Sequence, residues 1–162
     1  MAELTVLEEK LAEVLGLAQA AKAATDKVSS LTDEPDLSTA LRRMHDEADE
    51  TESRCTEVAG DIDGKKTAIL DKAKETKAEA TEMMKTYLGE DADALDGFEF
   101  LTMAEAGEVG HWKIVGTLNE RARLPGLDEL VSWAVPIQER HVATVRQTSL
   151  ALAGEEDPLE AG

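Results

Sequence analysis

Apolar residues recur at alternating steps of three and four along most of this chain, which is the pattern of helices that bury one face. The first stripe comprises Leu4, Leu7, Leu11, Val14, Ala18 and Ala21. Breaks rich in Gly, Pro and Asp separate the stripes, and Asp36 behind Pro35 is expected to cap the second one. The pattern predicts five helices, over about residues 3–28, 37–59, 65–88, 98–123 and 127–153.

The order of these helices indicates how they pack. The first two form one hairpin, the last two form another, and a highly charged helix over 65–88 lies in the connection. A helix of about 24 residues is about 36 Å long, enough to run the height of a bundle. We therefore expect an all-α, ferritin-like antiparallel four-helix bundle with a long crossover that carries an additional charged helix. The bundle would span residues 1–153, and residues 154–162 would form an acidic disordered tail.

Polar residues interrupt two of the stripes at matching heights. Glu108 and His111 fall on the stripe of the fourth helix, and Glu105 lies on its flank. Gln138 and His141 fall on the stripe of the fifth. Because the chain turns near residue 124, antiparallel packing would place Glu108 level with His141 and His111 level with Gln138. We expect two polar layers that cross the core.

A carboxylate and an imidazole three residues apart on one helix face suit a divalent metal ion. Glu-x-x-His is the repeated ligand motif of di-iron and di-manganese carboxylate bundles. The sequence thus predicts Fe, Mn or Zn in the core. The alternative is a hydrogen-bonded polar layer without metal, in a structural or interaction protein.

Three segments carry a family resemblance: "EVGHW" at 108–112, "PIQERHV" at 136–142 and, more loosely, "LRRMHDEADETE" at 41–52. With their surroundings they resemble small bacterial ferritin-like proteins, in the branch of the stress-induced YciF-like proteins. The resemblance covers the first, second, fourth and fifth helices and leaves the charged crossover out. It implies a ferritin-like fold and a metal site, and it does not imply iron storage.

The sequence departs from a complete di-iron pattern. Gln138 stands where a Glu is expected, with Glu139 one step round the helix, and no residue of the first helix is a clear ligand. On the second helix His45, Asp49 and Glu52 share one flank. The candidate metal ligands are Glu108, His111, His141, Gln138, Glu139, His45 and Glu52. A mononuclear site fits them as well as a dinuclear one; an enzyme built on them would have ferroxidase or peroxide chemistry.

The composition limits which classes of partner this protein can bind. A net charge of −18 disfavours nucleic acid and anionic membranes and attracts divalent cations. No apolar run is long enough to span a membrane, and "MAELTVLEEK" lacks the features of a secretory signal. Cys55, the single cysteine, falls on a core stripe. These features predict a cytoplasmic protein, in line with a role in stress protection, and leave a homo-oligomer open.

Overall fold

The computed structural model describes residues 2–162, and this part of the chain forms five helices and no strand. They are α1 (Val6–Ser29), α2 (Pro35–Gly60), α3 (Lys66–Tyr87), α4 (Ala94–Ala122) and α5 (Leu127–Glu155). Each lies within a few residues of its predicted range, and the predicted fold class is confirmed. The prediction succeeded because apolar residues spaced at alternating steps of three and four are typical of helices.

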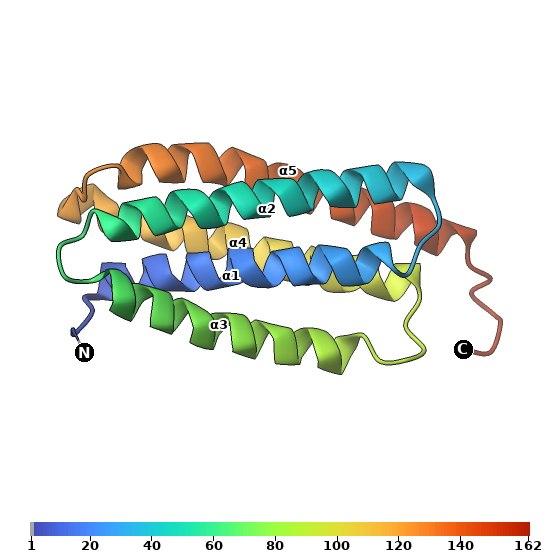
Figure 1. Ribbon diagram of the computed structural model, residues 1–162. Helices are drawn as coiled ribbons and strands as arrows, with labels where there is room; N and C mark the ends of the chain where they lie inside the picture. Colours follow the sequence, from blue (N-terminus) through green and yellow to red (C-terminus); the bar gives the residue numbers. More distant parts are fainter. Residues whose placement is uncertain (1) are drawn as a thin grey trace.

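The two hairpins and the crossover are arranged as expected (Figure 1). Helices α1 and α2 pack together, as do α4 and α5, and α1 also packs against α4. Helix α3 runs back alongside α1 and has little contact with α2 or α4. Gly16 allows this close packing, because a Cβ there would lie 2.4 Å from the carbonyl oxygen of Ala73 in α3.

Capping residues set the helix starts. Thr5 and Glu8 form a capping box at the start of α1, and Asp93 with Asp96 forms another at α4. The second box starts α4 at Ala94, four residues before the predicted position. The expected cap at Asp36 is wrong: α2 already begins at Pro35, whose fixed φ suits the first helical position, so Asp36 lies within the first turn.

The α4–α5 turn is built by side chains as well as backbone. Arg123 adopts the left-handed conformation (φ 52°) and Gly126 has φ 80°. Asn119, fully buried, accepts a hydrogen bond from the backbone amide of Leu124 at 2.8 Å and donates one to Asp128 at 3.0 Å. The turn therefore fixes how α4 and α5 align.

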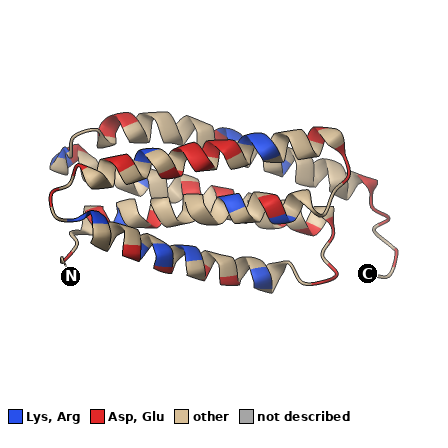
Figure 2. Ribbon diagram, in the orientation of Figure 1, with Lys and Arg blue, Asp and Glu red and all other residues tan. Residues whose placement is uncertain are grey.

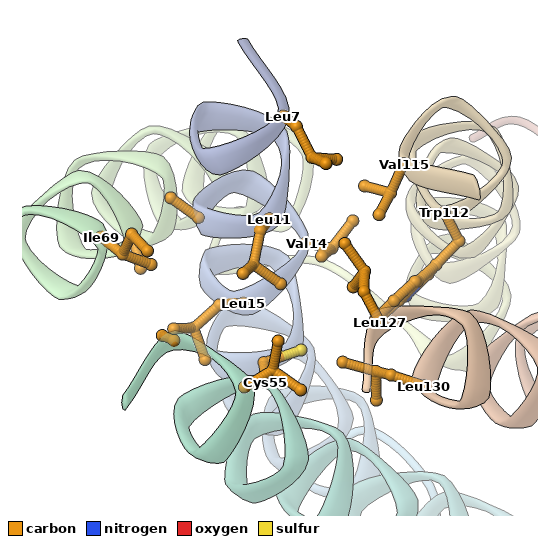
Figure 3. Packing of buried hydrophobic residues seen from close by; sticks show 14 of the residues in the cluster. Leu7, Leu11, Val14, Leu15, Cys55, Ile69, Trp112, Val115, Leu127 and Leu130 are labelled. Atoms are coloured by element: carbon orange, nitrogen blue, oxygen red, sulfur yellow. The ribbon is translucent and has the colours of Figure 1, made fainter. Parts of the chain in front are cut away.

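The apolar core consists of two clusters at opposite ends of the bundle. The first lies near the α4–α5 turn and is shown in Figure 3; it includes Leu11, Leu15, Cys55, Trp112 and Leu127. The second includes Val28, Leu41, Phe98, Leu101 and Val145. In α1, α2, α4 and α5, the residues that lie between the two clusters in sequence form the middle of the bundle core.

The crossover helix is only partly buried. Ile69 and Ala73 are buried, whereas Met83 and Tyr87, further along the helix, are 60% and 56% exposed. Figure 2 shows acidic and basic residues along its outer surface. Among residues 2–162, no helix is long and apolar enough to cross a membrane. Beyond α5, residues 156–162 are exposed, and their disorder stays a prediction.

Cys55 gives a direct test of the core. Its side chain is fully buried, and burial raises the pKa of its thiol. Because the thiolate is the reactive form, we expect a thiol reagent to label the native protein at least about a hundredfold more slowly than the urea-unfolded protein. Labelling kinetics at pH 7.5 measure this ratio. Equal rates would contradict the packing of α2 in the first cluster.

Candidate functional site

A polar layer separates the two apolar clusters. We define it as Glu47 of α2, Glu105 and Glu108 of α4, and Gln138 and His141 of α5. The last four are at most 4% exposed. Burying ionisable groups in the middle of a bundle is costly unless each finds a partner. The partners of these five residues therefore decide what the layer can do.

His141 lies between two carboxylates. Its Nδ1 is 3.4 Å from Glu105 Oε2 and its Nε2 is 3.1 Å from Glu47 Oε1. Burial lowers the pKa of His141, but the hydrogen bonds and charges of Glu105 and Glu47 outweigh it, so the pKa is raised. The imidazolium form can donate to both carboxylates at once. This contact links α2, α4 and α5.

Glu47 is also bound by arginine. Arg140 approaches both of its carboxylate oxygens, with Nη1 2.9 Å from Oε1, and Arg43 lies 3.6 Å away. Burial raises the pKa of Glu47, whereas hydrogen bonds from Arg140 and His141 lower it, and the result is a pKa of about 2. The carboxylate is thus ionised and paired at neutral pH.

Glu108 has no such partner. It is 4% exposed, and within the described chain no group donates a hydrogen bond to its carboxylate. Burial raises its pKa well above the usual range, and the neighbouring charge of Glu105 adds to the rise. The Oε1 atom of Gln138 is fully buried without a hydrogen-bond partner. The layer therefore contains a closed ion-pair network and, beside it, oxygen atoms that lack partners.

The buried face of α4 is rotated about the helix axis relative to the predicted one. Glu105 and Trp112 are buried at 1% and 0% exposure, whereas the side chain of His111 is 40% exposed. Its Nδ1 lies 2.8 Å from the carbonyl oxygen of Gly107, and its Nε2 lies 3.7 Å from Glu13 on α1. The prediction that His111 points into the core beside Gln138 is wrong. The large apolar ring of Trp112 takes the core position instead, since it gains more from burial.

The contact of His141 is shifted by one turn of α4. We expected Glu108 opposite His141, but Glu105 makes this contact. The expectation assumed that residues equally far from the turn in sequence lie at the same height in the bundle. The four residues between the two helices and the rotation of α4 change which residue of α4 lies opposite His141.

Three further candidates lie near the surface of the bundle. Glu139 pairs with Lys113 at 3.2 Å and is about half exposed. Glu52 pairs with Lys22 at 3.1 Å, and His45 lies 3.6 Å from Asp26. Of the predicted set, the structure buries Glu108, Gln138 and His141 in the bundle and leaves these three nearer its surface.

Sequence reasoning missed Glu47 and Arg140. Helix α2 carries many acidic residues, and Glu47 lies next to the stripe residue Ala48 rather than on it. The one available signal was that Arg140 directly precedes His141. Two basic side chains next to each other in sequence can share one carboxylate partner. Neither residue stands out by spacing alone.

An apolar cavity of about 270 Å³ adjoins the polar layer. It lies between α1, α3 and α4, and both Glu105 and Glu108 are among its lining residues. His111 also lines it. The carboxylate of Glu108 therefore adjoins open space, whereas Gln138 is not among the lining residues.

The polar layer does not form a complete metal-binding group. Throughout residues 2–162, no three His, Cys, Asp or Glu side chains converge as a metal-binding group. A dinuclear site does not fit, because Arg140 holds Glu47 and the buried acid of α1, Glu8, is bound by Thr5 and Lys65 at the end of the helix. Glu105, Glu108, Gln138 and His141 carry the oxygen and nitrogen donor types that divalent ions take, but they are not arranged as a ready binding group.

Comparison with solved structures gives a fold match. The chain is similar in structure to the E. coli stress protein YciF. The TM-score is 0.70 at 14% sequence identity, and the match covers 93% of this chain and 96% of that one. No known protein family and no curated protein matches the sequence.

Proposed function

We propose that this chain is a ferritin-like helical bundle that binds one divalent metal ion, iron, manganese or zinc, in its polar layer. The observation that carries the proposal is Glu108, a buried carboxyl beside a second carboxyl and without a hydrogen-bond donor or a cation of its own. A divalent ion would relieve the repulsion between Glu105 and Glu108. Gln138 Oε1 and, after loss of a proton, His141 would complete the donors.

The biological setting of this proposal rests on the fold. The similar protein YciF is named a stress protein, and we extend a role in stress to this chain on that likeness. The net charge of −18 supports a cation as the ligand, because it concentrates cations at the surface. The lone cysteine supports a cytoplasmic location.

Metal retention tests the proposal. After treatment with a chelator, the protein should bind about one equivalent of Mn²⁺, Zn²⁺ or, without oxygen, Fe²⁺, as measured by equilibrium dialysis with elemental analysis. His141→Ala and Glu108→Gln should each weaken binding at least about tenfold, because each removes a ligand. His45→Ala is the matched control and should bind like the wild type, since His45 lies on the surface.

A separate observation supports a second candidate function. The network of Glu105, His141, Glu47 and Arg140 is complete without metal and joins three helices. It favours a metal-free structural or interaction protein, in which the layer fixes the alignment of the helices. Dialysis that leaves all three ions unbound would select this function over the metal proposal.

A further inference from the structure

The cavity beside the polar layer is bounded by three helices. Leu17 and Ala20 of α1, Met84 of α3, and Phe100 and Ala104 of α4 form much of its wall. Its volume of about 270 Å³ is close to the lower end of small-molecule pockets, which measure about 300–1,000 Å³. A ligand with a short apolar body would fit this space.

Small residues keep the cavity open. Ala20, Ala24 and Ala104 line it, and Gly107 has no atom within 4 Å of the place where its Cβ would lie. A larger side chain at any of these positions would reduce the space. The core at the same height is otherwise well packed, with Leu101 fully buried in the same wall.

One end of the cavity is acidic. Glu108 lines it without a hydrogen-bond donor, and Glu105 lies one helical turn away. None of the lining residues is Lys or Arg, and His111 is the one lining residue that gains a positive charge on protonation. The walls are apolar and the polar end has room for a positive charge.

We propose that this cavity binds a small primary amine with an apolar tail, with the ammonium group at Glu108 and the tail among the alanines of α1 and α4. An ammonium group and a carboxylate form a charge-assisted hydrogen bond, which is strong where water is excluded. A fatty acid would place a second negative charge beside Glu108 and Glu105, and an alcohol would bring no charge. The amine would use the same carboxyl group as the proposed metal ion, so the proposal is tested in the presence of a chelator.

Octylamine, octanol and octanoate form a matched set of probes, because they share one tail and differ in head group. Isothermal titration calorimetry at pH 7.5 with EDTA should show octylamine binding at least about tenfold more tightly than octanol, and no binding of octanoate.

Three variants separate the head group from the tail. Glu108→Gln should weaken octylamine binding at least about tenfold and leave octanol binding unchanged. Glu120→Gln, at an exposed position of the same helix, should change nothing. Ala20→Phe should weaken both probes by filling the cavity, with circular dichroism confirming the helices.

The outcomes are distinct from those of the metal experiment. Octylamine and octanol that bind equally, or octanoate that binds best, would overturn the assignment of an amine. Absence of binding by all three probes would overturn the cavity as a site. A protein that retains no metal but binds octylamine more tightly than octanol would contradict the metal proposal alone.

Discussion

Replacing Glu47 by alanine is expected to lower the free energy of unfolding by about 3 kcal/mol at pH 7. Glu47 is the shared partner of His141 and Arg140, and its loss leaves His141, 2% exposed, with Glu105 alone. Breaking a buried pair by removing one partner costs about 3–5 kcal/mol, and the 17% exposure of Glu47 places it at the low end. Urea unfolding followed by circular dichroism measures the change.

Glu50→Ala is the matched control for this substitution. Glu50 lies on the same helix and pairs with Arg54 at 2.8 Å, but both side chains are about half exposed. Exposed pairs contribute about 0–1 kcal/mol, so the control should have little effect. Equal losses in the two variants would mean that the Glu47 network contributes no more than a surface pair.

The same network should give stability a definite dependence on pH. The pKa of Glu47 falls from 4.5 to about 2 on folding, so its contribution is present above pH 4.5 and is lost as the pH falls towards 2. The pKa of His141 is raised above 6.5, so its contribution is present below pH 6.5 and is lost as the pH rises through the folded value. Stability conferred by this network should therefore be greatest between about pH 4.5 and 6.5.

Replacing Glu108 by methionine is expected to stabilise the protein by about 1–3 kcal/mol at pH 8. The carboxyl group is largely buried without a donor, and a buried polar group left without a partner costs about this much. Because folding raises the pKa of Glu108, the folded form binds a proton more tightly, and the wild type loses stability as the pH rises above 4.5. The gain in the variant should therefore be larger at pH 8 than at pH 4, as measured by urea unfolding at both values.

Glu99→Met provides the comparison, because Glu99 is exposed on the same helix and should change stability by less than about 0.5 kcal/mol. If Glu108→Met destabilises the protein at pH 8, Glu108 has a partner in solution that the proposals do not include. Stabilisation together with loss of ligand binding is the pattern of a functional residue retained at a cost in stability.

The sequence by itself determined the helices and their connection. Alternating steps of three and four located all five helices, and the long charged segment between two hairpins led to the crossover bundle that the structure confirms. Helix starts were less certain, because a capping box such as that of Asp93 and Asp96 depends on local side-chain geometry. The sequence also located polar residues in the middle of the core at Glu108, Gln138 and His141.

Only the tertiary structure decided how these polar residues are paired. A helical stripe leaves a rotation of one residue open, and the burial of Trp112 turned α4 so that Glu105 entered the core and His111 left it. The partners Glu47 and Arg140 come from helices 93 residues apart in the chain, and no periodicity within either helix shows that contact. Helical period is a local property of the chain, whereas the choice of partner in a buried layer depends on which side chains the packed helices bring within hydrogen-bonding distance.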